Sequence, residues 1–420
     1  MNILGAAIML AAVFFWPRLP LWLFIIHAIS FVTVLLPSQD LGGLLSIPIL
    51  LELLMILSAL VRNSKNRKFP KLPKAESLLI FAMLIWAILS IIFRSDFKME
   101  ELHALRTNLF IPIAFFFGFL LLVDDRSGIR GSYVSILLAG LIIIVTGILN
   151  LMGLFSLKYG GIFEGQSRMT STLANPNQTA YILLFIASIF FAFLRNRNKA
   201  IRYCATGIFA GSLILVSFTL SRGALVTIMG MLLYALLNWK RAANVKGARY
   251  AFLLASFAIV FYAVSPQQYW IRAKYEDPRE EYRYKAFRAG ISMFLDSPIY
   301  GVGYGRYSRE GYKYNVLNIK KFGGAHNGYV QIFSELGIIG MLIWFLFILQ
   351  HWRKTQILIK TSKGEMFGSK WPMYGHSMQL AYVNYFFFNL TSHQAIVPDI
   401  ILLCAIATRL EELCRKNACT

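Results

Sequence analysis

Acidic side chains and cysteine are both scarce in this chain of 420 residues. It carries 20 Asp and Glu against 42 Lys and Arg, which gives a formal net charge of +22 at pH 7. The four cysteines all fall within or beside apolar segments: Cys204, Cys404, Cys414 and Cys419. The sequence therefore predicts no disulfide framework, and we expect no metal site or other cofactor.

Apolar side chains make up most of the chain. Hydrophobic residues account for 57% of it, and the mean hydropathy is +0.58. A soluble domain would be nearer 45–50% apolar, and runs of roughly 17–25 apolar residues are long enough to cross a bilayer as helices. Such runs occupy residues 41–61, 75–93, 104–123, 132–153, 203–219 and 326–350.

These runs do not alternate as strands of a membrane barrel would, and lipid accepts only helices or closed barrels. The sequence therefore predicts an all-α integral membrane protein with about 12 transmembrane helices. Residues 1–36 are broken by "WPRLP" at 16–20 and form either two short helices or a hairpin.

The positive charge is concentrated in a few connections. Basic clusters occur at 62–74, 195–202, 240–249 and 351–371. They alternate with connections that are poor in Lys and Arg, at 94–103 and 154–178. The positive-inside rule places the basic loops in the cytoplasm and the others outside. The charge then belongs to solvated loops, and no nucleic-acid partner is expected.

One connection is far longer than the rest and divides the chain into three parts. We expect an N-terminal helix bundle over 1–265, an outer loop over 266–325, and C-terminal spans with a cytoplasmic tail over 326–420. Within the loop, "REEYRYKAFRAGISMFLDS" (279–297) predicts a helix ended by Asp296. Its apolar and aromatic side chains fall on one face: Tyr284, Phe287, Ile291, Phe294 and Leu295.

The "GVGYG" that follows this helix (301–305) lacks the third glycine of a nucleotide-binding loop, because residue 306 is Arg. We expect these glycines to let the chain turn back toward the membrane.

Four motifs together resemble the O-antigen ligase and O-antigen polymerase superfamily. They are "NPNQTA" (175–180), "LSRGALV" (220–226), "RYKAFRAGISMFLDSPIYGVGYGRY" (283–307) and "AHNGYVQIFSELGIIG" (325–340). They occur in the order of that family, and the resemblance covers about residues 40–410. One departure is Phe287, where the family pattern leads us to expect Trp.

The resemblance implies a membrane glycosyltransferase of the bacterial inner membrane whose site faces the periplasm. Its donor would be a glycan on undecaprenyl diphosphate, and it would need no metal or sugar nucleotide. Among membrane partners, a ligase would use lipid A–core as acceptor, whereas a polymerase would use another glycan repeat. The single loop of moderate size favours the ligase.

Arginine and histidine are the residues best suited to this chemistry. Arg222 and Arg283 are expected to steady the charge that develops on the diphosphate, because guanidinium binds phosphate bidentately. Arg288 is a weaker third candidate. His326 is expected to accept the proton of the acceptor hydroxyl. The alternative is that His326 only caps the helix that follows.

Three asparagines and one glutamate complete the candidates. Asn327 is expected to bind substrate beside His326. Asn175 and Asn177 are also substrate-binding candidates, although capping of a helix start is the more economical interpretation for them. Glu335 is expected to pair within the helix bundle.

A transporter or lipid flippase is the alternative from another functional class. Such proteins usually contain internal repeats and broken helices that meet at the midplane of the membrane. No repeat is visible in this sequence. The two classes differ in where Arg222, Arg283 and His326 should lie: together at the outer face for the enzyme, or along a path through the membrane for a transporter.

Overall fold

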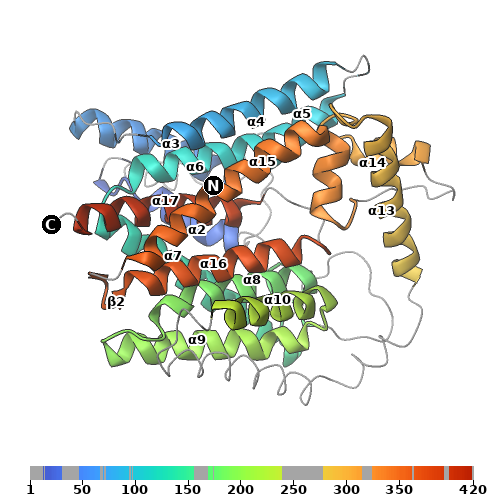
Figure 1. Ribbon diagram of the computed structural model, residues 1–420. Helices are drawn as coiled ribbons and strands as arrows, with labels where there is room; N and C mark the ends of the chain where they lie inside the picture. The colour runs from blue at the N-terminus through green and yellow to red at the C-terminus, as the bar shows by residue number, and fades with distance from the viewer. Residues whose placement is uncertain are drawn as a thin grey trace.

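The computed structural model describes most of the chain as a bundle of helices that run side by side (Figure 1). The described residues are 13, 15–30, 47–66, 70, 72–93, 96, 98–155, 169–173, 175–238, 278–314, 324–361, 364–391 and 397–418.

In this part of the chain, six helices are long and apolar enough to cross a membrane. They are α4 (Lys74–Ile92), α5 with η2 and α6 (Met99–Leu122), α7 (Arg126–Leu151), α8 with η3 (Pro176–Phe193), α9 (Lys199–Phe218) and α15 (Gly328–Lys360). Within this group, α5 is Met99–Leu105, the π-helical turn η2 is Arg106–Phe110, α6 is Ile111–Leu122, α8 is Pro176–Phe190 and the 3₁₀ turn η3 is Phe191–Phe193.

Further helices complete the bundle: α2 (Leu19–Ser30), α3 (Ile47–Asn66), α10 (Arg222–Asn238), α16 (Trp371–Phe388) and α17 (Pro398–Ala418). Both α2 and α10 are shorter apolar helices. The expected all-α membrane class is confirmed, whereas the number of 12 spans stays a prediction. Residues 1–12 lie outside the described residues, so the expected form of the N-terminus also stays a prediction.

The centre of the bundle is formed by helices that are buried nearly all round. Helix α8 buries every residue from Thr179 to Phe190, and most of α16 and α17 is also buried. Peripheral helices instead keep an exposed apolar stripe, which on α4 includes Phe81, Ile85 and Ile92. A helix that is apolar all round belongs inside, and lipid accepts the exposed stripes without the cost that water would impose.

The basic connections gather at one end of the bundle. Arg18 and Arg62 both reach Asp124, at 3.0 Å and 2.7 Å, and Arg197 pairs with Glu365 at 2.9 Å. The last pair joins the loop after α8 to a small hairpin, β1 (Glu365–Met366) with β2 (Ser369–Lys370). The loops predicted to be cytoplasmic therefore contact one another, as alternating spans require.

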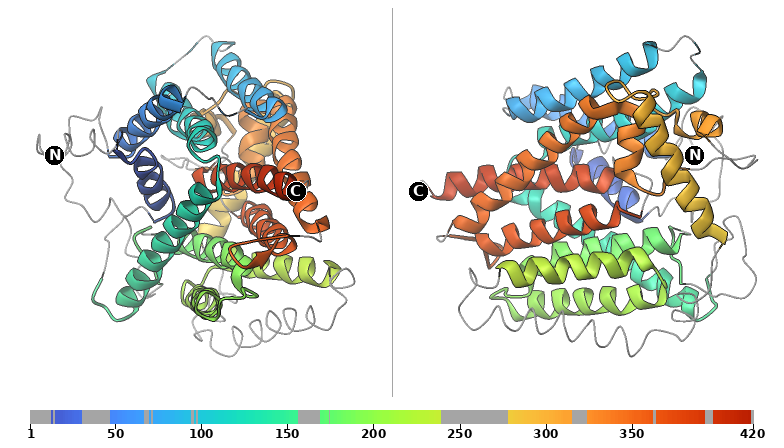
Figure 2. Two further views of the ribbon diagram at one scale, coloured as in Figure 1. Left: turned by 90° about the vertical axis from the view of Figure 1, so that its left-hand side faces the viewer. Right: turned by 45° about the vertical axis from the view of Figure 1, so that its right-hand side comes forward.

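The long outer loop contains the expected helix, α13 (Pro278–Asp296), and two short turns, α14 (Tyr307–Glu310) and η5 (Gly311–Tyr314). The predicted bounds of 279–297 are confirmed to within one residue at each end. Helix α13 lies across the end of the bundle and runs crosswise to the helices of the bundle (Figures 1 and 2).

A kink in α15 receives the turn that follows α13. Gly337 has φ 64° and ψ −167°, which interrupts the helix and frees carbonyl groups of the preceding turn. The N–H of Val302 donates to the Ser334 carbonyl at 2.7 Å, and the N–H of Gly303 donates to the Glu335 carbonyl at 3.0 Å. The "GVGYG" segment is thus a turn, as predicted, and Gly301, its first glycine, also has a positive φ.

Candidate active site

The mouth of α15 is organised by Asn327. Its Oδ1 accepts hydrogen bonds from the N–H groups of Tyr329 and Val330, both at 3.1 Å, so Asn327 is the N-cap of the helix. Its Nδ2 donates to the Leu390 carbonyl at 3.3 Å. The alternative interpretation of His326 as the cap is therefore wrong, and substrate binding by Asn327 stays a prediction.

His326 lies immediately before this cap, in an unusual backbone conformation. Its φ of 50° is left-handed, which costs a non-glycine residue about 1 kcal/mol or more. Its ring lies edge-on to Tyr282 of α13, with the ring centroids 5.8 Å apart. Because Arg283 is the next residue of α13, the loop helix brings this arginine to the same region as the histidine.

The residues that follow α16 contact both the start of α15, next to His326, and the start of α10. We call residues 389–391 the outer turn. The N–H of Gly328 donates to the Asn389 carbonyl at 2.9 Å. On α10, a Cβ placed on Gly223 would lie 2.3 Å from Thr391 Oγ1, so the start of α10 is packed against the same turn.

Arg222 is the first residue of α10, and its side chain is half-buried. The preceding Leu220 has φ 51°, and Ser221 Oγ accepts a hydrogen bond from the N–H of Ala224 at 3.3 Å. Arg222 thus lies at the N-terminus of a short apolar helix. It is next to the outer turn, which also contacts the start of α15. The structure brings Arg222, Arg283 and His326 to one end of the bundle.

Helix α8 begins at the same end. Asn175 Oδ1 accepts from the N–H groups of Asn177 and Gln178, at 2.9 Å and 3.4 Å. The capping interpretation of Asn175 is therefore confirmed, and Asn177 lies in the first turn with its side chain half-buried. The ring of Tyr181 packs on Phe388 at the end of α16, with centroids 4.8 Å apart.

Three helix starts thus adjoin the end of α16: those of α8, α10 and α15. A helix N-terminus carries about half a positive charge from its aligned peptide dipoles. Arg222 and Arg283 add full charges at this end. The combined field suits a polyanionic ligand such as a diphosphate.

Arg288 lies on a different face of α13. Its side chain is exposed, and its guanidinium group lies 5.8 Å from the centroid of the Tyr284 ring. The face of α13 that packs inward instead buries Ala286, Ala289 and Met293. The structure therefore does not bring Arg288 together with His326, and its part in substrate binding stays a prediction.

A charge cluster at the α13 end of the bundle, in which Arg306 and Glu101 are buried and Asp96 is exposed, was not expected from the sequence. Arg306 is only 1% exposed and pairs with Asp96 at 2.6 Å and with Glu101 at 3.1 Å. Arg309 reaches the same two carboxylates at 3.1 Å and 2.7 Å. The hydrogen bond from Arg306 holds the pKa of Asp96 below its ordinary value. This cluster ties the connection before α5 to the turn after α13.

In the sequence, the cluster is indicated by its acidic residues alone, because Asp and Glu are scarce in this chain. Asp96 and Glu101 lie in a loop that the charge pattern places outside, and a basic partner is the natural reason for burying a carboxylate. Nothing in the spacing identified Arg306 as that partner, because the two segments are more than 200 residues apart.

Glu335 is buried beside this cluster. Its carboxylate accepts hydrogen bonds from the N–H groups of Gly305 and Tyr307, at 3.1 Å and 3.3 Å, and from Gln331 Nε2 at 3.4 Å. The expected pairing within the helix bundle is met by Gln331 of the same helix, whereas the two backbone donors belong to the loop. Its contacts hold the turn after α13 in place.

Asp399, which had no expected role, lies buried at the start of α17. Its carboxylate accepts a hydrogen bond from the Tyr181 hydroxyl. Across the described ranges, no three His, Cys, Asp or Glu side chains gather in a way that could hold a metal ion.

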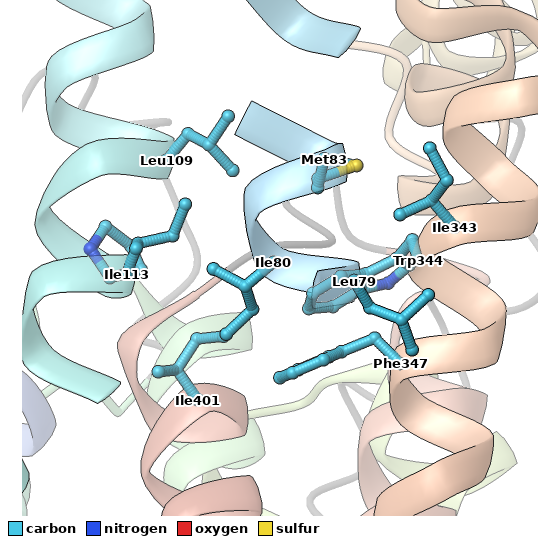
Figure 3. A pocket seen from close by; sticks show the side chains of 10 residues that line it. Leu79, Ile80, Met83, Leu109, Ile113, Ile343, Trp344, Phe347 and Ile401 are labelled. Carbon is cyan, nitrogen blue, oxygen red and sulfur yellow. The ribbon is translucent and has the colours of Figure 1, made fainter. Parts of the chain in front are cut away.

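A small cavity lies inside the bundle, between α4, η2, α6, α15 and α17 (Figure 3). Its lining side chains are Leu79, Ile80, Met83, Leu109, Pro112, Ile113, Ile343, Trp344, Phe347 and Ile401. This lining offers neither a charge nor a proton acceptor, so the cavity is unsuited to chemistry on a phosphate.

Comparison with known proteins supports the resemblance seen in the motifs. Residues 207–345 match a family model described as O-Antigen ligase. The match contains the start of α10, all of α13 and the mouth of α15, and thus Arg222, Arg283 and His326. No curated protein matches the chain.

The match confirms the resemblance and supports membership of the O-antigen ligase-like superfamily. Its members are membrane glycosyltransferase-like enzymes, ligases and polymerases, that act on lipid-linked polysaccharides.

Proposed function

We propose that this chain, whose residues 207–345 match the O-antigen ligase family, is an O-antigen ligase of the bacterial inner membrane. It would transfer a glycan from undecaprenyl diphosphate to a hydroxyl of lipid A–core, at the periplasmic face and without a metal. The observation that carries the proposal is that α10 and α15 both begin against the outer turn and that α13 contacts His326 at the mouth of α15, at the end of the bundle opposite the basic loops.

In the proposed reaction, the acceptor hydroxyl attacks the anomeric carbon as the C1–O bond to the diphosphate breaks. The diphosphate leaves with the electron pair, and the proton of the hydroxyl passes to the His326 imidazole. Arg222 and Arg283 stabilise the charge that develops on the leaving group, together with the helix N-termini. A single displacement of this kind inverts the configuration at C1.

The position of the charged residues favours this enzyme over a transporter. A transport path would need polar groups at successive depths of the membrane. Arg222, Arg283 and His326 instead lie at one end. A polymerase of the same family would use the same residues, so the acceptor decides between the two.

The product of the purified protein tests the proposal. Reconstituted protein would receive undecaprenyl-diphosphate glycan together with rough lipopolysaccharide, with EDTA present and no nucleotide. We expect glycan attached to lipid A–core. Longer glycan that remains on the polyprenyl carrier would identify a polymerase. A chain that moves the donor between leaflets of the vesicle without forming either product would be a transporter.

A further inference from the structure

Four large apolar side chains of α13 face outward. Tyr284, Phe287, Ile291 and Leu295 are 61%, 39%, 36% and 67% exposed, and they follow the spacing of one helix face. The opposite face carries small or slender residues, among them Ala286 and Ala289, and packs against α15 and Tyr307. The helix therefore presents these four bulky side chains, whereas Met293 is buried with the alanines and Phe294 packs edge-on against Phe333 of α15, with ring centroids 5.1 Å apart.

This outward face is continuous with the lipid-facing surface of the bundle. Just beyond the end of α13, Tyr300 stacks on Trp86 of α4, with ring centroids 5.5 Å apart, and contacts Phe93 edge-on at 5.8 Å. Ile92 and Phe93, at the end of α4, are themselves exposed. Aromatic side chains at the end of a span are typical of the interface between lipid and water.

The charge and direction of α13 agree with that position. Lys285 and Arg288 lie on the flanks of the apolar face, and the Arg288 guanidinium stacks on Tyr284. The helix lies across the ends of the spans, which makes it parallel to the plane of a bilayer that the spans cross (Figure 2). A helix with an apolar face and basic flanks binds in the headgroup region of anionic lipids.

We propose that α13 is an in-plane membrane helix whose face Tyr284–Phe287–Ile291–Leu295 lies in the outer leaflet of the bilayer. It would hold Tyr282 and Arg283, which lie between this face and the mouth of α15, at the depth of lipid phosphates. The inference does not rest on the proposed function, because it concerns where the helix lies and not what reaction follows.

Environment-sensitive labels on the full-length protein test this position. Cys204→Ser and Cys419→Ser leave Cys404 and Cys414, both buried, as the remaining native thiols. One added cysteine, at Ile291→Cys or Leu295→Cys, then carries an NBD fluorophore. Ser308→Cys, which is exposed on α14, is the aqueous control. Ile85→Cys, on the exposed stripe of α4, is the lipid control.

In vesicles of phosphatidylethanolamine and phosphatidylglycerol, spin-labelled lipid should quench the probes at 291 and 295 about twofold or more over the probe at 308. Aqueous iodide should show the reverse order. Two results would overturn the proposal. Quenching by iodide equal to that at 308 would place the helix in water, and resistance to both quenchers would mean that protein covers this face.

Discussion

At the scale of single residues, the hydrogen bonds at the start of α15 give Asn327 a structural role and His326 the place of the candidate base. Asn327 uses its Oδ1 for two N–H groups of α15 and its Nδ2 for Leu390, so its polar atoms hold the fold together. The left-handed conformation at His326 turns the chain just before the cap. The sequence could identify these residues, because His-Asn before an apolar run is a polar start. It could not assign the cap, which depends on where the first helical turn begins.

Substitution of Arg222 should separate charge from geometry. Arg222→Ala is expected to lower kcat for glycan transfer roughly 100- to 1,000-fold, since one donor to the developing charge is lost. Arg222→Lys keeps the charge but loses the planar pair of donors, so it should recover only part of the rate. Initial rates with reconstituted protein measure both. Arg353→Ala, an exposed arginine at the opposite end of α15, is the matched control.

Removal of Arg306 should destabilise the protein strongly. Arg306→Met removes one of the two arginine partners of the buried Glu101, while Arg309 still reaches that carboxylate at 2.7 Å. We therefore expect a cost of about 2–3 kcal/mol, less than the roughly 3–5 kcal/mol of a buried charge left wholly unpaired. Lys313→Met removes an exposed partner of Glu310 and should cost about 1 kcal/mol or less. Thermal unfolding in one detergent compares the two variants. Equal losses of Tm would show that the cluster contributes no more than a surface pair.

At the scale of elements, the sequence predicts helices better than it predicts which face each one buries. The period of apolar residues located α13 to within one residue at each end. The same period gives no sign that the bulky face is the exposed one, because an apolar face can meet protein or lipid equally well. The kink in α15 was also hidden, since a glycine such as Gly337 within a largely apolar run is not by itself a sign of a break in the helix.

Gly337 is expected to tolerate no side chain. Its φ of 64° is left-handed, and a Cβ placed there would lie 2.2 Å from the Ile299 carbonyl oxygen. Gly337→Ala should therefore cost about 1–2 kcal/mol from conformation alone, with the clash in addition.

The matched control for this variant is Gly211→Ala, in α9, where the glycine is half-buried and a Cβ meets nothing within 4 Å. That change should be neutral or stabilise by up to about 1 kcal/mol. Chemical unfolding gives the free energy of unfolding of both variants. Equal changes in that free energy would contradict the requirement for glycine at the kink.

At the scale of the whole molecule, the alternation of basic and neutral loops predicted the arrangement well. Arg197 and Glu365, from loops expected in the cytoplasm, form an ion pair at one end. The starts of α10 and α15, expected outside, adjoin the outer turn at the other. The distribution of Lys and Arg among successive loops is a property of the sequence, so the end of the bundle at which each loop lies can be predicted from it. The meeting of Arg222, Arg283 and His326 depends on packing between distant helices, and it could be inferred only from the family resemblance.

The transfer rate of His326→Ala, measured beside wild type in the reconstituted assay, tests whether the mouth of α15 is a catalytic site. We expect this rate to fall roughly 100- to 10,000-fold, as for removal of a general base. His103→Ala, an exposed histidine of α5 at the same end of the bundle, should retain the wild-type rate. Equal rates for wild type and His326→Ala, with glycan still transferred, would contradict a catalytic site at the mouth of α15.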